Sequence, residues 1–182
     1  MTLAATTDAS VEVLYSAEDI ATRITELCSE IVARDLHNPL VVPVLTGSFI
    51  FAADLLRGLH AAGMTPEVDF MTLASYRRGT RSSGSVDILR DMELDVSERD
   101  VLLVDDILDT GRTLAYAKDL IAARGARRLL TCVLLNKRVR RAVAIEADFA
   151  AFDCPSAFVV GYGMDLANRY RELPFVGRVV GS

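Results

Sequence analysis

Apolar residues recur along the chain in two patterns, one typical of amphipathic helices and the other of buried strands. After the segment Ser16–Asp19, which resembles the capping box of a helix start, isoleucine or leucine recurs at positions 20, 24, 27 and 31. Short continuous apolar runs bounded by turn residues indicate strands that are buried on both faces. The patterns predict helices at about 16–34, 48–61 and 112–124, and strands at 40–45, 68–73, 86–90, 101–105, 129–135, 149–152 and 157–160.

Strands that alternate with helices predict an α/β fold with a doubly wound, mostly parallel sheet. In such sheets, ligands bind beyond the carboxyl ends of the strands. Segments with chemically useful side chains follow four of the predicted strands. They are Thr46-Gly47, Asp105-Asp106, Lys137 and Asp165. We therefore expect one site where these strand ends converge.

Length and composition fit an ordinary globular domain. The 182 residues predict a disordered tail at 1–10 and a single domain at 11–182. The net charge of −5 argues against a surface that coats nucleic acid. No apolar run is long enough for a membrane span, and the N-terminus lacks the layout of a signal peptide. We expect a cytoplasmic protein with no nucleic-acid or membrane partner.

The three cysteines are irregularly spaced and include no Cys-x-x-Cys pair. Neither a zinc site nor a disulfide framework is indicated, and three buried thiols in a reducing compartment are expected. The two histidines form no triad pattern with a nucleophile.

The segment from Val101 to Thr113 carries the most specific chemistry. An apolar strand ends in Asp105-Asp106, and a third acid, Asp109, precedes Thr110-Gly111 at the start of a predicted helix. A helix start offers unpaired N–H groups and a positive dipole end to a phosphate. Paired carboxylates accept hydrogen bonds from vicinal hydroxyls, or face a divalent cation. Together these features predict a site for a phosphorylated sugar.

The 75–85 segment is long, polar and rich in glycine and serine. Loops of this length in compact domains are usually functional lids or disordered. We expect a flexible lid, with arginines that face a phosphorylated ligand when the lid closes.

The 101–113 segment closely resembles the motif with which type I phosphoribosyltransferases bind phosphoribosyl pyrophosphate (PRPP). Leu134–Lys137 and Phe158–Asp165, followed by Tyr170-Arg171, resemble the base-binding segments of the hypoxanthine-guanine phosphoribosyltransferases. With Thr46-Gly47-Ser48 and Ser75-Tyr76, the resemblance covers about residues 16–180. It implies the type I fold, with a small hood built from the terminal segments. It also implies purine salvage, in which PRPP and hypoxanthine or guanine give IMP or GMP and pyrophosphate.

The resemblance implies a role for each matching residue. Asp109 handles the proton at the purine N7 and is the catalytic residue. The residues implied for PRPP and its phosphates are Asp105, Asp106, Thr110, Gly111, Arg112, Thr113, Thr46, Gly47, Ser75, Tyr76 and Arg171. Those implied for the purine are Ile107, Lys137, Phe158, Val159 and Asp165. Magnesium is the implied cofactor, with Asp105 and Asp106 at one site and Asp165 at a second.

Two positions depart from the family pattern. The first loop carries Thr46 where relatives usually have lysine, and the peptide bond at this step of the family is often cis. Position 157, often lysine in relatives, is Ala157. Contacts that a lysine side chain makes at either position are therefore absent.

The alternatives are a xanthine-preferring transferase, an adenine-preferring one, and an RNA-binding regulator on the same fold. Lys137 suits a 6-oxopurine rather than adenine, while Asp109 and the acidic composition argue against the regulator. A homodimer or a homotetramer is expected, and the sequence does not decide between them.

Overall fold

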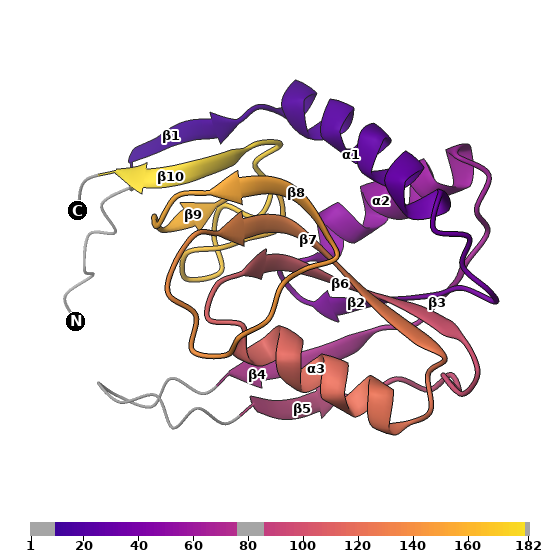
Figure 1. Ribbon diagram of the computed structural model, residues 1–182. Coiled ribbons are helices and arrows are strands. Elements are labelled where there is room, and N and C mark those ends of the chain that lie inside the picture. The colour runs from indigo at the N-terminus through magenta and orange to yellow at the C-terminus, as the bar shows by residue number, and fades with distance from the viewer. Residues whose placement is uncertain (1–9, 76–85, 181–182) are drawn as a thin grey trace.

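The computed structural model describes residues 10–75 and 86–180, and within these ranges the chain forms two sheets and three helices (Figure 1). The helices are α1 (Ala17–Val32), α2 (Phe49–Ala61) and α3 (Arg112–Ala123). The strands are β1 (Ser10–Tyr15), β2 (Leu40–Leu45), β3 (Glu67–Val68), β4 (Met71–Ser75), β5 (Val86–Arg90), β6 (Asp100–Leu108), β7 (Arg128–Lys137), β8 (Phe149–Cys154), β9 (Val159–Val160) and β10 (Val176–Val180).

The larger sheet has the strand order β5-β4-β2-β6-β7-β8, and β3 also pairs with β2. All of its pairings are parallel except that of β4 with β5. Helices α1 and α2 cover one face and α3 covers the other (Figure 1). The predicted doubly wound, mostly parallel sheet is confirmed.

The smaller sheet joins the two ends of the described chain. Its antiparallel order is β1-β10-β9, so strands from both termini lie beside one another. The predicted hood is built from the terminal segments, and its identification with this sheet stays a prediction. The prediction that the tail reaches residue 10 was wrong at that residue, because Ser10 pairs with Val180. Residues 1–9 lie outside the described ranges.

Two strand predictions near the site need correction. Strand β6 does not end at Asp105 but continues to Leu108, because its pairing with β7 extends through Ile107 opposite Leu135. The predicted 68–73 strand is interrupted after Val68. There the Asp69 carboxylate accepts hydrogen bonds from the backbone N–H groups of Phe70, Glu93 and Leu94.

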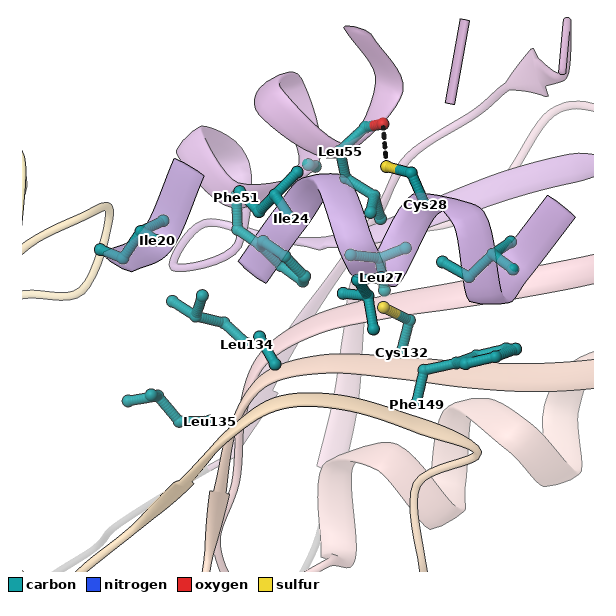
Figure 2. Packing of buried hydrophobic residues seen from close by; sticks show 14 of the residues in the cluster. Ile20, Ile24, Leu27, Cys28, Phe51, Leu55, Cys132, Leu134, Leu135 and Phe149 are labelled. Carbon is teal, nitrogen blue, oxygen red and sulfur yellow. Dashed lines mark hydrogen bonds between the residues drawn. The ribbon is translucent and has the colours of Figure 1, made fainter. Parts of the chain in front are cut away.

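Capping and periodicity explain α1. The Asp19 N–H donates to the Ser16 hydroxyl (3.1 Å) and the Ser16 N–H donates to the Asp19 carboxylate (2.9 Å), which confirms the predicted capping box. The apolar positions of α1 face the sheet and pack with α2 (Figure 2).

The core consists of two apolar clusters, one on each face of the larger sheet. Along β6, Leu102 and Val104 belong to the cluster under α1 and α2, while Val101 and Leu103 belong to the cluster under α3. This alternation is the period of two that a strand imposes on its side chains. Burial on both faces explains why the strand is a continuous apolar run.

The three cysteines are buried and free, as predicted. Burial raises the pKa of Cys28 to about 11, so its thiol stays protonated at neutral pH. Within the described ranges, no helix is both long enough and apolar enough to cross a membrane.

A charged cluster lies at the amino end of β6. The Asp100 side chain is nearly inaccessible and accepts hydrogen bonds from Arg127, Arg128 and the backbone N–H of His37. Burial alone would raise the pKa of Asp100, but these hydrogen bonds outweigh it and hold the pKa below its usual value. This cluster fixes the edge of the sheet opposite the carboxyl ends.

Candidate active site

A cleft of about 250 Å³ opens at the carboxyl ends of β2 and β6. This is the edge at which a doubly wound sheet binds ligands. Most of the predicted sugar-phosphate residues line the cleft, together with apolar residues from neighbouring elements. The lining residues are Val44, Leu45, Thr46, Gly47, Leu73, Asp105, Asp106, Ile107, Leu108, Asp109, Thr110, Gly111, Thr113 and Leu114.

The acid pair Asp105-Asp106 lines the cleft. Asp105 is 7% exposed, and its carboxylate accepts a hydrogen bond from the Asp106 N–H at 2.9 Å. Burial raises the pKa of Asp105 well above its usual value, and the neighbouring Asp106 charge adds to the rise. Burial also raises the pKa of Asp106, although hydrogen bonds and the positive charge of Arg171 oppose it. The rise in both pKa values follows from burying two neighbouring carboxylates, and hydroxyl donors or a cation would favour their ionised form.

The first loop, residues 46–48, packs directly against the acid pair. A β-carbon added at Gly47 would lie 1.8 Å from the Asp106 carboxylate oxygen, so any larger residue here would displace the Asp106 side chain. The Leu45–Thr46 peptide bond is cis, as the family pattern implies for this step. The buried Ser48 hydroxyl donates to the Val44 carbonyl at 2.6 Å and closes the turn into α2.

The 109–113 loop leads into α3. Gly111 is the N-cap residue with φ of 81°, a left-handed conformation that glycine adopts without strain. Its position offers no side chain to cap the helix, so the first N–H groups of α3 are not used by an N-cap side chain. Such a helix start binds an anion through backbone N–H groups and the helix dipole.

Lys137 lies at the end of β7 and reaches the 109–113 loop. Its ammonium group lies 3.1 Å from the Asp109 carboxylate, and its side chain is 13% exposed. The structure thus brings together the residues predicted to handle the purine proton and the 6-oxo group. Lys137 touches the cleft wall through Asp109 rather than lining it.

Asp165 and Arg171 form a second pair beside the first loop. Their side chains lie 2.8 Å apart, and Arg171 also donates to the Gly163 carbonyl at 2.6 Å. Gly163 itself packs against the first loop, since a β-carbon there would lie 2.3 Å from the Gly47 carbonyl oxygen. Asp165 follows a turn after β9, which belongs to the smaller sheet. Asp165 thus follows a strand, as predicted, but this strand is not part of the sheet that carries Asp105 and Lys137, as had been expected.

The predicted purine-stacking segment is separate from the cleft wall. Phe158 is 51% exposed, and its carbonyl accepts from the Val179 N–H. Val159 is buried and pairs with Arg178 of β10. Of the other predicted residues, Arg112 begins α3 outside the cleft wall, Ser75 ends β4, and Tyr76 and the rest of the 75–85 lid lie outside the described residues.

Sequence reasoning missed the apolar part of the cleft wall. Val44, Leu73, Leu108 and Leu114 line it, but in the sequence they are indistinguishable from core positions. Gly163 was also missed as a contact of the first loop. Its place between two aromatic or apolar residues in Gly-Tyr-Gly-Met was the available signal for close backbone approach.

Comparison with known proteins agrees with this geometry. The model of the phosphoribosyl transferase domain family matches residues 10–167. The chain is 44% identical over 167 residues to the hypoxanthine-guanine phosphoribosyltransferase of Streptococcus agalactiae, covering 91% of each chain. It is also 47% identical over 167 residues to the bifunctional protein TilS/HprT of Listeria innocua. That match covers 91% of this chain but only 25% of the longer Listeria protein.

A solved structure shows the same fold. The hypoxanthine phosphoribosyltransferase of Trypanosoma cruzi, in complex with the product IMP, superposes with a TM-score of 0.86 at 36% identity. The match covers 94% of this chain and 95% of that one.

Proposed function

The chain belongs to the hypoxanthine-guanine phosphoribosyltransferase family, and we propose that the cleft described above carries out the family's purine-salvage reaction. In this reaction the 5-phosphoribosyl group passes from PRPP to hypoxanthine or guanine, which gives IMP or GMP and pyrophosphate. The observation that carries the proposal is a single cleft wall in which the acid pair Asp105-Asp106, Asp109 and Thr110-Gly111 lead to the uncapped start of α3.

PRPP fits this wall in one orientation. Its 5′-phosphate accepts hydrogen bonds from the N–H groups at the start of α3 and from Thr110 and Thr113. Its ribose hydroxyls donate to Asp105 and Asp106, which favours the ionised form of these acids. The pyrophosphate then lies toward the first loop and Arg171, whose charge already reaches Asp106.

The donor set of the cleft fits magnesium. Within the described ranges, no group of three or more histidine, cysteine, aspartate or glutamate side chains forms a complete metal cage. Magnesium is usually held by one or two carboxylates together with substrate phosphates. Asp105 and Asp106 would supply the carboxylates at one magnesium site, and Asp165 would supply one at a second. When bound, the ion neutralises charge on the departing pyrophosphate.

Lys137 and Asp109 have different roles toward the purine base. The lysine carries three donors and no acceptor, so it suits the 6-oxo group of hypoxanthine or guanine. The 3.1 Å pair with Asp109 places the carboxylate next to that group. We assign Asp109 to the proton at N7, which must leave as N9 bonds to the ribose carbon or be stabilised during that step.

The exposed ring of Phe158 is a stacking surface for the purine, and Val159 presents backbone groups beside it. Ile107 contributes an apolar contact from the cleft wall. Position 157 adds no polar group, because it is alanine. Discrimination at the purine 2-position then rests on backbone groups near Val159 and Asp165.

We also propose that the chain works in the cytoplasm as a homodimer or a homotetramer. The net charge of −5 and the buried free thiols support a reducing, aqueous compartment. Size-exclusion chromatography with light scattering would distinguish the two assemblies from a monomer.

A steady-state assay tests the proposal. Purified protein receives PRPP and magnesium with hypoxanthine, guanine, xanthine, adenine or uracil, and nucleotide and pyrophosphate are both measured. We expect turnover with hypoxanthine or guanine that stops when the magnesium is chelated. A preference for xanthine would support the alternative specificity. Absence of turnover with every purine would refute the proposed enzymatic function.

A further inference from the structure

The 138–148 segment connects β7 to β8 and passes beside the start of α3 (Figure 1). It contains no helix or strand, yet it packs against the 109–113 loop. The N–H groups of Ala142 and Val143 both donate to the Thr110 carbonyl, at 3.1 and 3.2 Å. The segment is thus a second support for the loop that we assign to the 5′-phosphate.

Side-chain packing reinforces the contact. A β-carbon added at Gly111 would lie 2.7 Å from the Ile145 side chain and 3.0 Å from the Val143 carbonyl oxygen. The glycine at the helix start is therefore enclosed by the segment on one side. Any drift of the segment would alter the direction of the first N–H groups of α3.

Arg141 holds the segment in shape. Its guanidinium donates to the Ile145 carbonyl at 2.5 Å, to Glu146 at 2.6 Å, and to the side-chain oxygen of Asn136. The side chain is 12% exposed, so most of it is shielded from water. Glu146 is 83% exposed, so screening weakens this ion pair and the two neutral acceptors matter more.

The acceptors of Arg141 belong to two parts of the fold, strand β7 and the 138–148 segment. Asn136 lies near the end of β7, immediately before Lys137, where it pairs with Leu108 of β6 and its side-chain amide donates to Asp153 of β8 at 3.1 Å. Ile145 is the residue that packs over Gly111. One guanidinium therefore ties the irregular segment to the end of the central sheet.

We propose that Arg141 is a positioning residue for the 5′-phosphate site. It fixes the 138–148 segment, the segment fixes the carbonyl of Thr110 and the backbone of Gly111, and these set the N–H groups that receive the phosphate. This inference rests on the proposed function, because it needs a phosphate at the start of α3. Arg141 itself does not line the cleft.

The guanidinium is required for its shape as well as its charge. Two acceptors at fixed positions match the planar fork of arginine, whereas lysine offers one flexible ammonium. Arg141→Lys therefore restores only part of what Arg141→Met removes. The neighbouring Arg140 is exposed, so Arg140→Met is a matched control for the loss of a positive charge from the same segment.

Binding of two probes tests the proposal. Isothermal titration calorimetry measures ribose 5-phosphate, which uses the 109–113 loop, and magnesium pyrophosphate, which uses the first loop. We expect Arg141→Met to weaken ribose 5-phosphate binding about tenfold, the loss from one charge-assisted contact. Pyrophosphate binding should stay within twofold, and Arg140→Met should match wild type with both probes.

Kinetics and hydrogen exchange supply two further readouts. Arg141→Met should raise KM for PRPP about tenfold and change kcat by less than threefold. The amides of residues 142 and 143 should exchange faster, because their bonds to Thr110 open more often. If Arg141→Met does not fold, the same measurements on Arg141→Lys decide, with an expected change of about threefold.

Failure of this inference is separable from failure of the proposed function. Wild-type protein that neither binds ribose 5-phosphate nor turns over a purine would refute the function. Active wild-type protein with unchanged ribose 5-phosphate affinity in Arg141→Met would overturn only the role of Arg141. An equal loss of affinity for ribose 5-phosphate and for magnesium pyrophosphate would overturn it too, because the substitution would then disturb the whole cleft rather than the 5′-phosphate site.

Discussion

Gly47→Ala probes the contact between the first loop and the acid pair. The added β-carbon would lie 1.8 Å from one carboxylate oxygen of Asp106 and 2.7 Å from its carboxyl carbon. The oxygen must retreat by about 1.7 Å to reach a van der Waals separation of about 3.5 Å. Since this oxygen is assigned to the ribose hydroxyls and magnesium, the substitution displaces a ligand-binding atom with the smallest possible side chain.

The expected losses follow from that displacement. A misplacement of about 1 Å in a catalytic arrangement costs about 10²-fold in rate, so kcat/KM for PRPP should fall at least about 100-fold. Overpacking typically costs about 1–3 kcal/mol, and Asp106 lines a cleft into which its side chain can move, so the loss of stability should lie at the lower end.

Steady-state kinetics and thermal denaturation of Gly47→Ala and Gly58→Ala separate the two effects. Gly58 lies on α2, where an added β-carbon would lie 2.6 Å from the Cys28 sulfur, far from the acid pair. Gly58→Ala should change Tm, with the clash partly offset by better helix propensity, and leave kcat/KM within about threefold. Gly47→Ala with wild-type kcat/KM would refute the assignment of Asp106 to PRPP.

Three further substitutions test the site. Lys137→Ala should reduce kcat/KM for hypoxanthine far more than for adenine, because adenine presents a 6-amino donor to the lysine; similar wild-type values for both bases would contradict the assignment. Asp109→Ala should lower kcat by about 10²–10⁴-fold while PRPP affinity, measured by calorimetry, changes only a few-fold. Asp105→Asn should abolish most activity but raise Tm at neutral pH. Burial and the Asp106 charge raise the pKa of Asp105 above its unfolded value of 3.8. The wild-type free energy of unfolding is therefore unaffected by Asp105 below the unfolded pKa and falls as pH rises through the folded pKa, whereas asparagine does not ionise. The gain in Tm over wild type should therefore disappear below about pH 4, and a gain that is constant with pH would contradict this reasoning.

Residues whose role depends on local pattern were predictable from the sequence. The apolar run before Asp105, the acids and the Thr-Gly step identified a strand, a loop and a helix start without any knowledge of the fold. The rule that parallel strands present their carboxyl ends at one edge then placed Thr46 and Asp105 in the same cleft. The capping box at Ser16 was equally local and equally visible.

Features that depend on distant pairing were not predictable in the same way. Strand β6 continues through its acids only because β7 remains paired beside it, and Asp69 breaks a strand only because residues 93 and 94 come to its carboxylate. The short strands β1 and β10 stabilise each other across almost the whole length of the chain. The sequence around Gly163 indicates only a turn residue, and its close approach to Gly47 is visible only in the structure.

Strand β6 carries two buried aspartates in opposite circumstances, Asp100 inside its charged cluster and Asp105 in the cleft. They are five positions apart in the sequence, which is about 16 Å along a strand. Effects of substitutions more than about 7–10 Å apart usually add independently. A variant that alters the cleft at a cost to folding can therefore be compensated at the Asp100 edge, or on the faces under the helices, without disturbing the new chemistry. Because the two ends of β6 act independently, the substrate specificity of the cleft can change while the rest of the fold stays stable.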